Sequence, residues 1–235
     1  MSLFQLTDFE NCEPIRIGSP FDGGYVALNH NLDKVSALYS YGVSDNIDFE
    51  TEFCHKFNAT AFLYDHTIDQ LPFSVKGLHW YKQGIAHCQS ESFDTLSNHL
   101  DATRDLCDET GELVLKMDVE GAEYKSLSST PDEVLSRFSQ IYIELHGVDN
   151  IDTLEKYTEK YQFMKKLTHQ FYIYHAHINN HAGIIKIGKY RIPQVLELTL
   201  VNRKTTAATK KHTRNLPIKR IDSSNCLKLC DPKLN

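Results

Sequence analysis

Long apolar runs are missing from this sequence: no stretch approaches the ~18 consecutive apolar residues that a membrane-spanning helix needs. Its opening segment, MSLFQLTDFENC, has acidic side chains where a secretion signal has basic ones followed by an apolar stretch. Cysteine is scarce, with six among 235 residues, which excludes a disulfide scaffold. Cys226 and Cys230 have three residues between them, which is not the usual zinc-knuckle spacing. We therefore expect a cytoplasmic protein with free thiols.

The remaining composition is that of an ordinary globular protein, with 41% hydrophobic and 24% charged residues. The charge is uneven, because residues 203–220 contain seven basic side chains and no acidic one, whereas residues 1–202 contain 16 basic and 29 acidic ones. We expect residues 203–235 to form a basic tail outside the folded core, so that a chain ending near Asn202 folds alone. Such a tail suits an anionic partner, but contact with the acidic body or with solvent alone is favoured.

Strand-like and helix-like segments alternate along most of the chain. Short β-branched or aromatic runs predict strands, and apolar residues at three- and four-residue spacing predict helices. The predicted strands are residues 35–42, 59–65, 78–85, 112–119, 140–147, 172–178 and 195–202; the predicted helices are residues 47–57, 92–104, 122–138 and 153–171, with a break at Pro131. This order predicts an α/β fold with a doubly wound, mostly parallel sheet. Before it, the Asp-Gly-Gly turn at residues 22–24 predicts a β-hairpin within residues 1–34.

In a doubly wound sheet, ligands bind beyond the carboxyl ends of the strands. Gly42 ends the first predicted strand, where it permits a ligand to approach the backbone or serves a plain turn. Asp65 ends the second strand about twenty residues later, which is the spacing at which an acid accepts two hydrogen bonds from a ribose. Capping of the following turn is the alternative for Asp65. His66 beside it can stack on a ligand or cap the turn.

The densest group of ionisable residues is KMDVEGAE, residues 116–123. Asp118 ends the strand and is the residue favoured for function, because a turn needs only one acid as its cap. Glu123 lies in the first turn of the next helix, where the helix dipole favours an acid. Glu144 and His146 end the following strand, which we expect beside this one. Asp118, Glu144 and His146 are therefore candidate catalytic residues, and His146 also fits a metal ligand or a hydrogen-bonded core histidine.

The segment LVLKMDVEGAEYKSL followed by QIYIELHG resembles the FkbM-type methyltransferases, a branch of the class I S-adenosylmethionine-dependent enzymes. The segments RIGSPFDGGYV, YSYGVSDNIDFE, FLYDHT and IPQVLELTLVNR resemble further parts of that family, so the likeness covers residues 15–203. It implies a Rossmann-like domain at residues 35–202 with a seven-stranded sheet whose last strand is antiparallel. The sequence departs from the family at SYGVSDN, where the typical motif is D-x-G-A-N or GxGxG.

The resemblance also implies S-adenosyl-L-methionine as the cofactor. It assigns to the cofactor's methionine end Tyr41, Gly42 and Val43, to its ribose Asp65 with His66 alongside, to its adenine Gly84 and Ile85, and to the transferring methyl group Asp118. The expected reaction is O-methylation of a sugar or another small hydroxylated acceptor. Proton removal from the acceptor falls to Asp118, Glu144 or His146, whose roles the sequence does not divide.

Other interpretations remain open at this level. A non-catalytic binding module with a decayed cofactor loop is the main alternative, because the first motif has a single glycine. The missing GxGxxG argues against a nicotinamide-dependent oxidoreductase, and the acidic body argues against a nucleic-acid methyltransferase. His175 and His177 share one face of a predicted strand and offer, with Asp118 and His146, an alternative divalent-metal site. A hydrogen-bonding acceptor pocket without metal is preferred.

Overall fold

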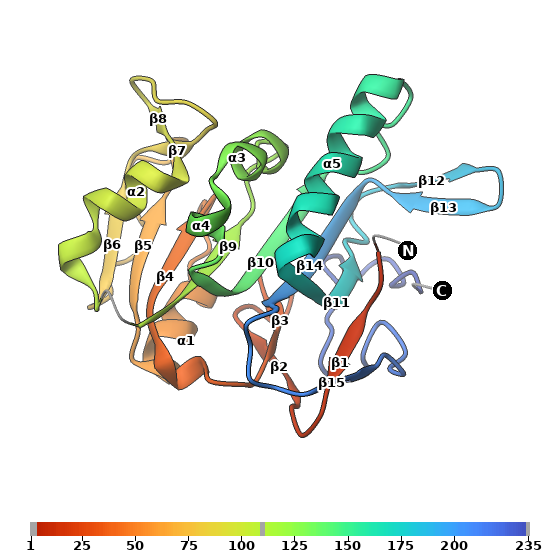
Figure 1. Ribbon diagram of the computed structural model, residues 1–235, viewed down its shortest axis with the longest axis horizontal. Coiled ribbons are helices and arrows are strands. Elements are labelled where there is room, and N and C mark those ends of the chain that lie inside the picture. Colours follow the sequence, from red (N-terminus) through yellow and green to blue (C-terminus); the bar gives the residue numbers. More distant parts are fainter. Residues whose placement is uncertain (1–3, 109–110, 234–235) are drawn as a thin grey trace.

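A seven-stranded sheet forms the centre of the computed structural model, which describes residues 4–108 and 111–233 (Figure 1). In spatial order its strands are β11 (Phe171–Ile178), β14 (Val195–Asn202), β10 (Phe138–His146), β9 (Glu112–Met117), β4 (Val35–Tyr41), β5 (Thr60–Tyr64) and β6 (Leu78–Tyr81). The strands from β10 to β6 pair in parallel, whereas β14 runs antiparallel to both β10 and β11. The mostly parallel α/β sheet predicted from the alternating segments is confirmed.

The helices lie on both faces of this sheet (Figure 1). They are α1 (Asp48–Phe57), α2 (Leu96–Ala102), α3 (Glu123–Ser129), α4 (Asp132–Leu135) and α5 (Leu154–Gln170), with short 3-10 turns at Leu32–Lys34 and Arg104–Leu106. Two of the helices begin at threonines, because the hydroxyls of Thr95 and Thr153 accept hydrogen bonds from backbone N–H groups of the first turns of α2 and α5. Pro131 separates α3 from α4, which is the predicted break.

Two apolar clusters hold these layers together. The larger one packs α2, α3, α4 and α5 on one face of the sheet and includes Tyr41, Phe138 and Phe163, all fully buried. The smaller one packs α1 on the opposite face and includes Phe49 and Tyr142. Burying aromatic side chains on both faces supplies most of the drive to form the sheet, because the stabilisation scales with the apolar area removed from water.

The opposite face has one helix, and β-ribbons cover the rest of it. The hairpin of β2 (Pro14–Ile17) and β3 (Tyr25–Leu28) contributes to the same apolar cluster as α1, which agrees with the hairpin predicted within residues 1–34. Beside it, β1 (Thr7–Phe9) pairs with β15 (Thr209–Lys211), so the two ends of the chain form one ribbon. Figure 1 shows both ribbons beneath the half of the sheet that holds β10, β14 and β11.

The basic tail packs on the sheet, which corrects the expectation that all of residues 203–235 lie outside the core. Leu216 is buried in the larger apolar cluster. Arg214 donates a 2.6 Å hydrogen bond to the buried Asp8, and His175 in β11 donates one of 2.8 Å to Asp222. The tail is thus held by specific buried side chains of the body, Asp8 and His175, which composition alone does not reveal.

Two further strand assignments differ from the prediction. Residues 78–85 form two strands, because the chain leaves the sheet after β6 and β7 (Gly84–Ile85) pairs with β8 (Phe93–Asp94). A hairpin of β12 (Ile184–Ile187) and β13 (Tyr190–Pro193) was not predicted and extends from the sheet between β11 and β14 (Figure 1). Within the described part of the chain, no helix combines the length and the apolar character needed to cross a bilayer.

Candidate functional site

A cavity of about 300 Å³ lies at the carboxyl ends of β4, β5 and β9. Its lining residues are Gly42, Ser44, Tyr64, Asp65, His66, Thr67, Gly84, Ile85, Phe93, Asp118, Val119, Glu120 and Ala122. Six of the eight residues predicted to contact the cofactor are among them. The structure thus brings together strand ends that lie far apart in the sequence, as the parallel sheet requires.

Tyr41 and Val43 do not line this cavity. The Tyr41 ring is fully buried, stacks on Tyr64, and its hydroxyl lies 3.1 Å from Nδ1 of His99. Val43 packs in the apolar cluster on the α1 face. Both side chains are used by the core, and they lie in the two clusters on opposite faces of the sheet, because the strand ends at Tyr41, and Gly42, with its φ of +73°, changes the direction of the chain. Their predicted contact with a cofactor is not supported by this arrangement.

Gly42 is required by the approach of two chain segments. Its φ is +73°, and a Cβ placed on it would lie 1.6 Å from the carbonyl oxygen of Asp118. The backbone N–H of Asp118 in turn donates a 3.0 Å hydrogen bond to the carbonyl of Tyr41. Gly42 therefore lets the end of β4 touch the end of β9 and sets the position of Asp118 at the cavity wall.

Asp65 connects the two loops at the cavity edge. One carboxylate oxygen accepts a 2.9 Å hydrogen bond from the backbone N–H of Ser44, and the other accepts bonds of 2.7 and 2.6 Å from the backbone N–H and hydroxyl of Thr67. Burial alone would raise the pKa of Asp65, but the hydrogen bonds from Thr67 and Ser44 hold it below the ordinary value. The turn-capping alternative is thus present in the structure, and Asp65 also faces the cavity.

His66, Gly84, Ile85 and Phe93 form another part of the cavity wall. The His66 ring lies 4.5 Å from the ring of Phe93, measured between centroids. A Cβ on Gly84 would come within 2.6 Å of the Phe93 ring and 3.0 Å of Nδ1 of His66, so only glycine fits between them. Ile85 follows as a buried neighbour. Phe93 was missed by the sequence analysis, which predicted a helix over residues 92–104, whereas Phe93 lies in the short strand β8 and α2 begins at Leu96.

The carboxyl groups of Asp118 and Glu144 lie close together at the ends of β9 and β10. Burial raises the pKa of Asp118, and the charges of Lys116 and His146 oppose that shift. Burial, and then the charge of Asp118, raise the pKa of Glu144 to about 10. Asn179 donates a 2.7 Å hydrogen bond to Glu144. Of the two carboxyls, Asp118 is the one that lines the cavity.

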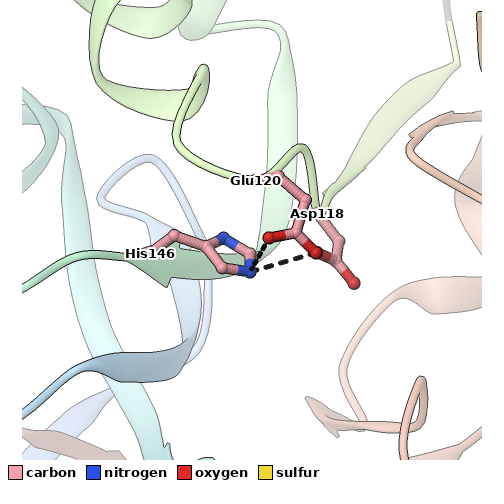
Figure 2. Close-up of side chains that lie close together, drawn as sticks. All are labelled: Asp118, Glu120 and His146. Atoms are coloured by element: carbon pink, nitrogen blue, oxygen red, sulfur yellow. Dashed lines mark ion pairs between the residues drawn. The ribbon is translucent and has the colours of Figure 1, made fainter. Parts of the chain in front are cut away.

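His146 is held by Glu123 and points at two other acids (Figure 2). Its Nδ1 donates a 2.9 Å hydrogen bond to the fully buried Glu123, while its Nε2 lies 3.4 Å from Glu120 and 3.8 Å from Asp118. Burial favours the neutral ring, but the hydrogen bond to Glu123 and the charges of Glu123, Asp118 and Glu120 raise the pKa of His146. The three predicted catalytic residues Asp118, Glu144 and His146 are therefore brought together.

Glu123 has a larger part than the helix-dipole role that its position predicts. Its Oε1 accepts 3.2 Å hydrogen bonds from the backbone N–H groups of Val119 and Gly121 as well as the bond from His146. The same carboxylate oxygen therefore fixes the loop after β9 and orients the imidazole of His146. Glu123 follows Glu120 by three residues, and nothing in the sequence distinguishes it from an ordinary acid in the first turn of a helix. Its burial could therefore not be predicted.

Two groups of described side chains are close enough to share a metal ion. They are Asp118 with Glu120 and His146, and Asp22 with Glu144 and Glu197. His175 and His177 belong to neither group, because His175 donates to Asp222 and His177 lies 3.2 Å from Glu197. The metal site suggested for both histidines together with Asp118 and His146 is therefore not formed, since the tail and β14 engage them elsewhere.

No family model and no curated protein matches this chain. Among solved structures, a chain from the crystal structure of a fibrillarin/Nop5p complex is similar at 7% identity and a TM-score of 0.40, covering 72% of this chain and 73% of that one. The Methanococcus jannaschii fibrillarin, a pre-rRNA processing protein, is similar at 8% identity and a TM-score of 0.36, covering 82% and 83%. None of these comparisons shows the FkbM family that the sequence motifs resemble.

Proposed function

We propose that this protein is an S-adenosylmethionine-dependent methyltransferase that acts on a hydroxyl group of a small acceptor, such as a sugar. The observation that carries the proposal is the cavity at the ends of β4, β5 and β9, which is lined by both Asp65 and Asp118. The reversed strand β14 between β10 and β11 also matches the sheet that the FkbM resemblance implies.

The residues at the cavity fit such a cofactor. A volume of about 300 Å³ is at the small end of the range for ligand pockets. Ile85 and Phe93 provide an apolar slot for a purine. Asp65 has one lone pair left for a ribose hydroxyl, because a carboxylate accepts about four hydrogen bonds and three of them come from Ser44 and Thr67. The methionine end then points toward Asp118. When bound, the cofactor supplies an electrophilic methyl group on a sulfonium centre.

The chain's own residues have two tasks in this reaction. They align the acceptor oxygen with the methyl carbon, and they take up the proton of the hydroxyl. With the cofactor bound, the acceptor oxygen would take the methyl group, the electron pair of the C–S bond would stay on sulfur, and the proton of the hydroxyl would pass to the Asp118 carboxylate. Glu144 and His146, at the end of β10, lie beside Asp118.

A binding measurement with S-adenosylhomocysteine tests the proposal. Calorimetry on the full chain is expected to show one site. Asp65→Asn is expected to weaken binding by about 2 kcal/mol, because the charged hydrogen bonds to ribose and to the Ser44 loop are lost together. Asp69→Asn is the matched control, since Asp69 lies four residues further on, is 91% exposed and pairs with Lys82; its affinity should equal that of the wild type.

The competing function is a binding module without catalysis. Two observations favour it. The space beside Gly42, where a Cβ would lie, is occupied by the carbonyl of Asp118, and Asp65 already accepts hydrogen bonds from three donors. No heat and no thermal stabilisation at millimolar S-adenosylhomocysteine would leave this second function standing. Binding that is equal in the wild type and Asp65→Asn would show that the ribose site lies elsewhere.

A further inference from the structure

We propose that Asp118, Glu120 and His146 bind a divalent cation beside the cofactor cavity. Figure 2 shows Nε2 of His146, at the end of β10, directed at both carboxylates of the loop after β9. One ligand atom from each residue lies within 4.8 Å of the other two. Asp118 and Glu120 also line the cavity, so a cation held here would lie at the edge of the proposed methyl-transfer site.

The separations suit a shared ion better than direct hydrogen bonds. Nε2 of His146 is 3.4 Å from Oε2 of Glu120 and 3.8 Å from Oδ1 of Asp118, whereas an N–H···O hydrogen bond is about 2.7–3.2 Å long. Oxygen and nitrogen ligands about 2.0–2.2 Å from one metal ion lie ~3.0–3.5 Å from each other in tetrahedral or octahedral coordination. A small inward movement of the carboxylates brings all three atoms to that distance.

The other side of His146 supplies the independent support. Nδ1 donates to Glu123, which is fully buried, and in the neutral ring this bond places the proton on Nδ1 and leaves the lone pair of Nε2 facing the two acids. A carboxylate that orients the imidazole in this way is the usual partner of a metal-binding histidine. Glu123 also fixes the backbone of the loop through Val119 and Gly121, so the Asp118 and Glu120 positions depend on the same side chain.

The donor set indicates which ions fit. Two carboxylates and one imidazole, with no cysteine among them, suit Mn²⁺, Zn²⁺ or Fe²⁺ and exclude a thiolate-preferring ion such as Cu⁺. Three protein ligands leave coordination positions open. The Glu120 side chain is 87% exposed and the His146 side chain 16% exposed, so an acceptor can reach the open positions from solvent while the ion is anchored from the buried side.

The role of the cation rests on the proposed function, although its binding does not. Two neighbouring hydroxyls of an acceptor can occupy the open positions, which would fix one oxygen opposite the methyl group. Coordination lowers the pKa of a bound hydroxyl. Its proton then passes to the oxygen of Asp118 that does not ligate the ion, because each carboxylate oxygen has two lone pairs.

Titration with Mn²⁺, followed by electron paramagnetic resonance of the free ion, tests the site on the full chain after chelator treatment. One Mn²⁺ per chain is expected, with nitrogen modulation in the electron spin echo from His146. Glu120→Gln and His146→Gln are each expected to weaken binding by about tenfold or more. Glu155→Gln, at an exposed position on α5, is the matched control and should bind as the wild type.

Each result bears on one hypothesis at a time. Absence of saturable binding, or equal binding in the wild type and Glu120→Gln, would overturn the cation site; Glu120 is exposed, so that variant tests the site even if His146→Gln fails to fold. Mn²⁺ binding without S-adenosylhomocysteine binding would keep the cation site and reject the methyltransferase. The reverse pattern would keep the methyltransferase and reject the cation site.

Discussion

Glu123 shows how one buried side chain can carry both structure and chemistry. Its Oε1 accepts three hydrogen bonds, two from the loop after β9 and one from His146. The sequence points first to Asp118, because that acid ends the most apolar strand. In the structure, the positions of Asp118 and His146 both depend on Glu123, so the two acids of the motif act on the same site in different ways.

Replacing Glu123 is expected to affect stability and site geometry together. Glu123→Gln keeps the size but loses the charge that attracts the two N–H groups and the imidazole. It should lower the free energy of unfolding by about 1–3 kcal/mol, which is the cost of weakening buried hydrogen bonds to a charged group. Urea denaturation in the presence of a chelator measures the change without a contribution from bound metal.

Asp118→Asn is the comparison for that prediction. The Asp118 side chain is partly exposed, and asparagine has nearly the same size, so the urea midpoint should hardly move. Turnover, once an acceptor is known, should fall by ~10²-fold or more from loss of the proton acceptor. If Asp118→Asn proved as destabilising as Glu123→Gln, Asp118 would be a structural residue and the base would have to be sought at His146.

At the scale of elements, the site depends on the close meeting of the ends of β4 and β9. Gly42→Ala is expected to cost about 3 kcal/mol or more, because its Cβ would overlap the Asp118 carbonyl at 1.6 Å and its φ is +73°. Gly77→Ala is the control: its φ is +88° and nothing lies within 4 Å of the new Cβ, so only the backbone strain of about 1 kcal/mol is added. Thermal unfolding of both variants gives the difference. If Gly42→Ala and Gly77→Ala lost equal stability, the ends of β4 and β9 would be able to move apart and make room for the new Cβ.

The strand ends could be predicted from the sequence, whereas several contacts at those ends could not. Alternating segments and the acids after each strand predict that residues from Gly42 to Asp118 meet at one edge, since parallel strands align their carboxyl ends. The direction of each side chain depends on local backbone detail. Tyr41 turns into the core, and Phe93 enters through the β7–β8 pairing, which has no sequence motif. Asp65 caps the turn that follows β5, which was the alternative to its predicted contact with a ribose.

At the scale of the whole molecule, segments from the two ends of the chain cover the part of the α1 face of the sheet that the helix does not cover. The α1 face of the sheet is completed by the β2–β3 hairpin and by the ribbon of β1 and β15, and Phe9, Leu28, Tyr174 and Val201 form a small apolar cluster there. The basic composition of residues 203–220 predicts that the tail binds acidic groups, but it does not identify those groups. The specific partners of the tail are Asp8 in β1 and His175 in the edge strand β11, which are adjacent only after folding.

Removing the tail is therefore expected to damage the fold. A chain ending at Asn202 loses the β1–β15 pairing and exposes the cluster around Leu216. It also leaves the buried Asp8 without its hydrogen bonds from His212, Thr213 and Arg214, and an unpaired buried carboxylate costs about 3–5 kcal/mol. Such a chain should be insoluble or melt far below the full chain. A chain ending at Asp231 keeps all these contacts and is the control. Equal melting temperatures for the two chains would restore the view of the tail as an independent appendage, because the buried contacts of Asp8 and Asp222 would then contribute nothing measurable.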